Sequence, residues 1–137
     1  MGIQSNVEVQ TEWGIVSARQ AGRNLAKEAG FSSVDQARIA TAISELARNI
    51  YLYANNGEII IEFLENENVS PPRRGIKITA RDEGPGIDNI RNAMEDGYTT
   101  SGGLGAGLPG VKRLMDEFDI DSRSGVGTEI TAIKWLR

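Results

Sequence analysis

The chain of 137 residues contains no cysteine and no histidine. Without cysteine it can form neither a disulfide framework nor a thiolate metal site. Without histidine it has no imidazole to serve as general base, metal ligand or phosphoryl acceptor, so acid or base chemistry falls to carboxylates, lysine or tyrosine. The sequence also lacks the run of about 20 apolar residues that a membrane span needs, and its first residues lack the basic and apolar regions of a secretory signal. We therefore expect a cytoplasmic protein with no membrane partner.

Basic residues are outnumbered by acidic ones. The 15 Lys and Arg against 19 Asp and Glu give a net charge of −4, whereas general nucleic-acid binders neutralise phosphates with a basic face. We expect no nucleic-acid partner, and an anionic ligand would have to be held locally. The length suits one ordinary domain, so we expect residues 1–137 to form a single domain.

The spacing of apolar residues predicts strands grouped with helices. In chain order the patterns indicate a strand over 7–11, helices over 15–29 and 33–54, strands over 58–64 and 75–82, helices over 87–94 and 111–118, and strands over 119–124 and 128–135. Because strands and helices do not strictly alternate, we expect an α+β fold. Its architecture would be a two-layer α/β sandwich, with one mixed or antiparallel sheet and the helices packed on one face.

Glycine is abundant in one place. Six of the 16 glycines lie between Gly97 and Gly110, and a helical pattern follows at once. Glycine lets successive backbone N–H groups approach an anion, and Pro109 suits the first turn of a helix whose free amides point the same way. The pattern predicts a phosphate-binding loop. A surface loop that uses its glycines only for flexibility is the alternative.

Glu45 and Asn49 are four residues apart on the long predicted helix, so both project from one face, with Thr41 on the same stripe. Apolar neighbours pull this helix into the core, and the stripe would border the interior. A carboxylate there can orient or deprotonate a hydroxyl, and an amide oxygen suits Mg²⁺. A solvated helix face is the simpler alternative.

Asp82 ends a predicted strand on the same face as its apolar residues, so its side chain would point to the buried side. A carboxylate only accepts hydrogen bonds and would suit the exocyclic amine of adenine. Gly86 would let a flat base approach the backbone, and Thr128 shares strand parity with Ile130 and could reach the same base. The alternative is an Asp that caps a turn beside Gly and Pro.

Four segments taken in this order resemble the N, G1 and G2 boxes and the trailing threonine of the GHKL ATPases: Glu-Leu-Ala-Arg-Asn at 45–49, Asp-Glu-Gly-Pro-Gly at 82–86, Gly-Leu-Gly-Ala-Gly-Leu at 103–108 and Gly-Thr at 127–128. Within this superfamily the chain looks like the anti-sigma-factor-type serine/threonine kinases, including the switch kinases of the bacterial stressosome. The resemblance implies the Bergerat-type ATPase fold and an ATP-dependent, Mg²⁺-dependent protein serine/threonine kinase.

The resemblance also implies roles for single residues. Glu45 would be catalytic, polarising the substrate hydroxyl, and Asn49 would hold Mg²⁺. The residues expected to bind ATP are Asn49, Asp82, Gly84, Gly86, Ile87, Gly103, Leu104, Gly105, Ala106, Gly107, Leu108 and Thr128, with residues 89–101 as a short ATP lid. Many superfamily members follow the metal-binding Asn with a small residue, whereas this chain has Ile50-Tyr51.

In such kinases the substrate is a STAS-domain protein, the released kinase can activate a PP2C-type phosphatase, and the partners can form a large stressosome assembly. We expect the same partners here. The alternative is a nucleotide-gated binding module that acts only by activating a partner, because one pocket could serve both uses.

Overall fold

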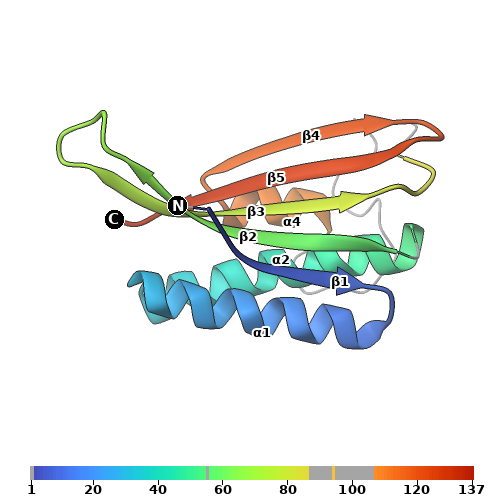
Figure 1. Cartoon of the computed structure of the whole chain (residues 1–137), viewed down its shortest axis with the longest axis horizontal. Helices are drawn as coiled ribbons and strands as arrows, with labels where there is room; N and C mark the ends of the chain where they lie inside the picture. Colours follow the sequence, from blue (N-terminus) through green and yellow to red (C-terminus); the bar gives the residue numbers. More distant parts are fainter. Residues whose placement is uncertain (1, 55, 87–93, 95–106) are drawn as a thin grey trace.

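The computed structural model describes residues 2–54, 56–86, 94 and 107–137. Its elements, shown in Figure 1, are β1 (Gly2–Val9), α1 (Glu12–Ala29), α2 (Ser33–Tyr53), β2 (Gly57–Asn66), β3 (Arg73–Asp82), α4 (Leu108–Leu114), β4 (Glu117–Arg123) and β5 (Gly127–Trp135). The helix predicted over 87–94 lies outside the described residues, except for its last position.

The strands form a sheet in the order β1-β2-β3-β5-β4, and each neighbouring pair is antiparallel. The helices α1, α2 and α4 lie together on one face of this sheet (Figure 1). The predicted α+β sandwich, with one antiparallel sheet and its helices on one side, is therefore confirmed.

The register defines two ends of the sheet. At one end Gly57 of β2 pairs with Asp82, which pairs with Thr128. At the other end Gly2 pairs with Phe63 and Gly75 pairs with Trp135, so the first and last strands bring both chain ends to this side. Figure 1 shows the N and C labels at this same end.

Both long helices stop within one residue of the predicted positions and α2 starts as predicted, whereas α1 starts at Glu12, three residues before the predicted start. The Ser32 hydroxyl accepts a hydrogen bond from the Asp35 backbone N–H at 3.2 Å and caps the start of α2. Gly30 ends α1 with a φ of +97°, a left-handed conformation that glycine adopts without a steric penalty. These signals are local, which is why the sequence alone predicts them.

The core lies between the helices and the sheet. A Cβ on Gly22 of α1 would collide with Ile43 of α2, so glycine at this position allows the two helices to pack closely. Large side chains that are almost completely buried come from α2 and from three strands: Ile39, Ile43, Leu46, Ile50, Ile59, Ile61, Ile76, Ile78 and Ile130. Burying each of them stabilises the fold by about 1.5–3 kcal/mol.

The prediction for residues 111–118 is wrong in its second half. Helix α4 ends at Leu114, Met115 is extended, and Phe118 belongs to β4, which starts at Glu117. Alternate residues Phe118 and Ile120 of β4 pack against the core while β4 pairs with β5. Strand pairing therefore overrides the local helical spacing.

The first strand is also longer than predicted. It begins at Gly2 rather than at residue 7 and ends at Val9. The polar residues at its start show no clear alternation, but they pair with the second half of β2, with an irregularity between Ile3 and Ser5. This pairing partner is distant in sequence, so the local pattern could not reveal it.

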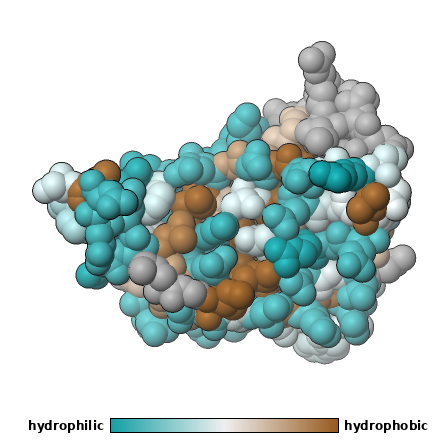
Figure 2. Space-filling view, turned by 45° about the horizontal axis from the view of Figure 1, so that its top comes forward, coloured by the Kyte–Doolittle hydropathy of each residue, from teal (hydrophilic) through white to brown (hydrophobic). Residues whose placement is uncertain are grey.

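The sheet face away from the helices is mixed in character. Ile60 and Thr79 are buried near its middle, and Arg81 lies between Glu58 at 3.6 Å and Glu129 at 2.8 Å. Figure 2 shows apolar side chains in the middle of the visible face and hydrophilic ones around them. In the described part of the chain, no helix has the length and apolar character required to cross a membrane.

Candidate functional site

The turn after β3 carries Asp82. Its strand neighbours on the same face, Ile78 and Ala80, are buried, which confirms the predicted parity. The Asp82 Oδ1 accepts a hydrogen bond from the Gly84 N–H at 2.9 Å, as in the turn-capping alternative. Because this bond uses one carboxylate oxygen, Oδ2 is left to accept a hydrogen bond from a ligand. Asp82 can thus cap the turn and accept a hydrogen bond from a ligand in the same geometry.

Main-chain packing from two sides fixes this turn. A Cβ on Gly84 would lie 2.6 Å from the Cβ of Ala54, at the C-terminal end of α2. On the other side, the Pro85 carbonyl accepts a hydrogen bond from the Gly125 N–H at 2.6 Å, which ties the turn to the β4–β5 connection. Gly86 has a φ of +78°, and a Cβ there would collide with the Arg123 carbonyl. Glycine is required at 86 by this packing, whether or not a base lies beside it.

Thr128 on β5 is paired with Asp82 on the neighbouring strand β3. It is 6% exposed, and its hydroxyl is 2.8 Å from the hydroxyl of Ser122. The preceding Gly127 has a φ of +149°, and a Cβ there would collide with the Asp82 carbonyl. The structure therefore brings Asp82 and Thr128 together, as the strand parity predicts.

Helix α2 carries Glu45 and Asn49 toward the same end of the sheet. Glu45 is only 4% exposed, although it carries a carboxylate, and it does not lack a partner. Asn49 is half-buried. A Cβ added to Gly57, the first residue of β2, would lie 2.8 Å from the side chain of Ile50 and 3.0 Å from the Asp82 Cβ. The last turns of α2 therefore pack closely against the ends of β2 and β3. The burial of Glu45 excludes a solvated helix face at this position.

Helix α4 begins after Gly107, which has a φ of +73° and whose carbonyl accepts the Val111 N–H at 3.2 Å. Pro109 lies in the first turn, as predicted, and α4 packs against α2. Leu108 is buried. The other predicted residues of this region, Ile87, Gly103, Leu104, Gly105 and Ala106, lie outside the described residues, as does the predicted lid over 89–101.

The sequence interpretation missed a second polar cluster, away from the Asp82 end of the sheet. Lys134 is 6% exposed on the core face of β5, and its Nζ donates a hydrogen bond to the Leu114 carbonyl at 2.9 Å. The same Nζ lies 3.7 Å from Asp116 Oδ1 and 3.9 Å from Asp35 Oδ1. The sequence does carry a signal for it, because the alternation that buries Thr128, Ile130 and Ala132 places Lys134 on the same face.

Asp116 is the centre of this cluster. Burial raises the pKa of its carboxyl, but the Trp135 N–H, Lys134 and Arg137 outweigh burial and hold the pKa below its ordinary value. The Trp135 N–H donates to Oδ2 at 2.7 Å, and Arg137 donates to Oδ1 at 2.6 Å. The carboxylate is therefore charged and well satisfied at neutral pH.

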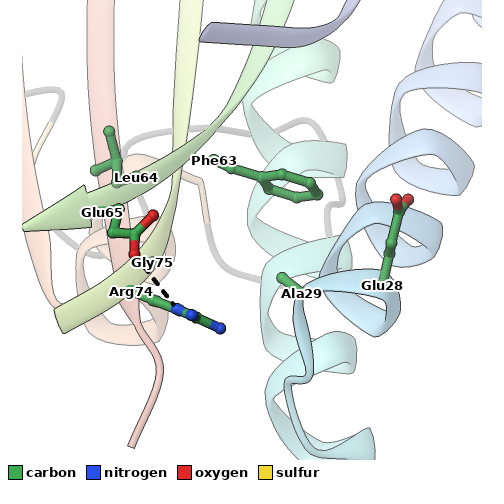
Figure 3. A pocket seen from close by; sticks show the side chains of 7 residues that line it. All are labelled: Glu28, Ala29, Phe63, Leu64, Glu65, Arg74 and Gly75. Atoms are coloured by element: carbon green, nitrogen blue, oxygen red, sulfur yellow. Dashed lines mark ion pairs between the residues drawn. The ribbon is translucent and has the colours of Figure 1, made fainter. Parts of the chain in front are cut away.

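A hollow of about 290 Å³ lies at the opposite end of the sheet (Figure 3). Its lining comes from the end of α1 and from the outer part of the β2–β3 hairpin: Glu28, Ala29, Phe63, Leu64, Glu65, Arg74 and Gly75. Arg74 and Glu65, which are paired between β3 and β2, form an ion pair at 3.8 Å on its strand side. This lining includes none of the predicted site residues that the structure describes, which separates the hollow from the Asp82 end.

Comparison with known proteins gives a consistent result. Residues 11–134 match the family described as "Histidine kinase-like ATPase domain". The chain is 66% identical over 137 residues to the serine/threonine-protein kinase RsbT of Bacillus subtilis (strain 168), and the match covers the whole of both chains. It is 36% identical over 103 residues to an anti-sigma F factor of Clostridium beijerinckii, which covers 70% of this chain and 68% of that protein. An anti-sigma F factor of Bacillus cytotoxicus is 35% identical over 103 residues, covering 72% and 68% of the two chains.

Proposed function

The chain belongs to the family of histidine kinase-like ATPase domains, and from this premise we propose that it is the kinase of a bacterial partner switch. It is a protein serine/threonine kinase, in keeping with its full-length identity of 66% to such an enzyme. Its ATP would lie at the Asp82 end of the sheet, between α2 and the strands. The observation that carries this placement is the convergence of Asp82, Thr128 and the last turns of α2 at one end of the sheet.

Adenine would be recognised at the end of β3. Asp82 Oδ1 is occupied by the turn, and Oδ2 would accept the hydrogen bond from the exocyclic amine. The Thr128 hydroxyl, opposite Asp82 in the sheet, would contact the base directly or through a water molecule. The phosphates would extend toward Gly107 and the predicted glycine-rich segment before it.

A single protein oxygen from Asn49 would bind Mg²⁺. The described residues contain no group of three acidic, histidine or cysteine side chains that could hold a metal ion. This fits Mg²⁺ in a nucleotide site, because the ion there usually keeps several waters and takes one or two protein ligands besides the phosphates. When bound, the ion neutralises charge on the phosphates during transfer.

Glu45 would act as the catalytic base. Its carboxylate would accept the proton of a substrate serine or threonine hydroxyl, while the hydroxyl oxygen bonds to the γ-phosphorus and the bond to ADP breaks. The helix holds the buried side chain in place, and positioning is the main contribution that an enzyme makes to phosphoryl transfer. The predicted substrate is a STAS-domain protein of a stressosome. When released from it, the kinase would activate a PP2C-type phosphatase in the cytoplasm.

The Glu45→Gln variant tests this function. It should bind Mg-ATP as the wild type does, but single-turnover transfer to a STAS-domain partner should fall by about 10²–10⁴-fold, because the amide cannot accept the proton. Glu28→Gln, an exposed carboxylate at the far end of the sheet, is the matched control and should retain both activities. Unchanged phosphoryl transfer by the Glu45 variant would show that Glu45 is not the catalytic base. No transfer by the wild type, together with activation of a phosphatase, would favour the non-catalytic switch.

A further inference from the structure

The buried ammonium of Lys134 joins two helices at the end away from their predicted ligand contacts. Asp35 lies in the first turn of α2, and Leu114 is the last residue of α4. The Lys134 Nζ donates a hydrogen bond to the Leu114 carbonyl at 2.9 Å and forms a longer ion pair with Asp35 Oδ1 at 3.9 Å. The same Asp35 oxygen also accepts a hydrogen bond from Arg38 at 2.9 Å. One side chain from β5 therefore links the start of α2 to the end of α4.

These helices carry the two halves of the proposed ATP site. Helix α2 holds Glu45 and Asn49, and α4 follows Gly107. Helix α4 has only seven residues, too few for a helix to be stable without tertiary contacts. Its C-terminal end is held by the Lys134 hydrogen bond and by the Asp116 N–H, which donates to the Ile133 carbonyl at 2.8 Å.

The cost of burying Lys134 indicates a specific role. An apolar side chain would continue the alternation of β5 without the desolvation penalty of an ammonium, and such replacements are often neutral or stabilising. A lysine, unlike an apolar residue, donates a directed hydrogen bond to a helix end and attracts the carboxylate of another helix. Its contacts therefore connect α4 to α2, in addition to the direct packing of the two helices.

We propose that Lys134 is a positioning residue that fixes α4 relative to α2 and thereby sets the affinity for ATP. The proposal rests on the proposed function only for the identity of the ligand. Lys134 touches neither the base nor the acceptor hydroxyl in this scheme. Its loss should loosen nucleotide binding while the phosphoryl-transfer step remains nearly intact.

The Lys134→Met variant, with kinetics and a distance measurement, tests the proposal. The KM for ATP should rise about tenfold with kcat changed less than about twofold, because a displaced α4 weakens binding but leaves Glu45 in place. Since the chain has no cysteine, spin labels can be attached to Ala37→Cys on α2 and Lys112→Cys on α4, both exposed positions. The distance distribution between the labels should broaden in the Lys134→Met background without nucleotide.

Two further proteins separate positioning from a general loss of stability. Lys134→Cys alkylated with 2-bromoethylamine before refolding carries an amine at nearly the original position and should restore the KM. Lys77→Met, which removes the charge of a half-buried lysine on the other face of the sheet, should leave KM and distances unchanged. A KM equal to that of the wild type, or an unchanged distance distribution, in Lys134→Met would overturn the inference. If the distances broaden but the wild type binds no ATP, the positioning role stands and the proposed function fails.

Discussion

Asp82 offers a test that separates its role in the turn from its proposed role in a ligand site. In Asp82→Asn the side-chain oxygen can still accept the Gly84 N–H, which lies 2.9 Å from Oδ1 in the wild type. The second oxygen becomes an NH₂ group, a donor that would face the donor amine of adenine. The substitution should therefore preserve the turn and damage only the proposed base contact.

The magnitude follows from the kind of hydrogen bond that is lost. A hydrogen bond to a charged group contributes about 1.5–3 kcal/mol, so affinity for Mg-ATP should fall by about 10- to 150-fold. The free energy of unfolding should change by less than about 1 kcal/mol, because the bond to Gly84 persists with a neutral acceptor. Asp82→Ala removes both interactions and should lose the affinity and about 1–2 kcal/mol more of stability.

Calorimetric titration with Mg-ATP and urea denaturation of the same samples measure the two effects. Asp121→Asn, an exposed carboxylate on β4, is the control and should match the wild type in both. Wild-type affinity in Asp82→Asn would refute the adenine contact. Equal losses of stability in the Asn and Ala variants would show instead that the turn does not depend on the Gly84 hydrogen bond.

Three other changes have defined outcomes. Gly127→Ala should lower the free energy of unfolding, measured in urea, by about 1–3 kcal/mol, because Gly127 has a φ of +149° and a Cβ there would collide with the Asp82 carbonyl. Gly125→Ala, whose Cβ would meet no atom within 4 Å, should lower it less, and equal losses in the two variants would contradict this reasoning. The folded-state pKa of Asp116 is depressed, so its contribution to stability is present above the ordinary carboxyl pKa and is lost as the pH falls through the folded-state pKa. Asp116→Asn should therefore flatten this part of the pH–stability curve, and an unaltered curve would contradict the stabilising role of the carboxylate. Chelation with EDTA should abolish most of the heat of ATP binding, and an undiminished heat would contradict the proposed binding of Mg²⁺ by Asn49.

Local signals explain what the sequence can predict. The Ser32 cap, the stop at Gly30 and the alternation that ends in Asp82 and Thr128 each involve a few adjacent residues. Their consequences, including the shared face of Asp82 and Thr128, follow from backbone geometry alone. The fold class and this part of the candidate site can therefore be predicted from the order of the residues.

Features that depend on distant partners cannot be predicted in this way. Phe118 occupies a helical position in the local pattern, yet β4 pairs with β5, and the start of β1 is irregular in the pattern, yet it pairs with β2. The alternation of β5 places Lys134 on the buried face, but it does not reveal the partners of the ammonium, because only the folded chain brings Leu114 and Asp116 to it. In each case a long-range contact outweighs the local preference.

The register of the first and last strands of the chain has a practical consequence for reagents. Gly2 pairs with Phe63 and Trp135 pairs with Gly75, at the end of the sheet opposite Asp82. Fluorescent proteins fused to both termini would start at the same end of the sheet, and an affinity tag at either one would be attached away from the Asp82 end. Immobilised binding assays and energy-transfer reporters can thus be built without placing a bulky group over the proposed nucleotide site.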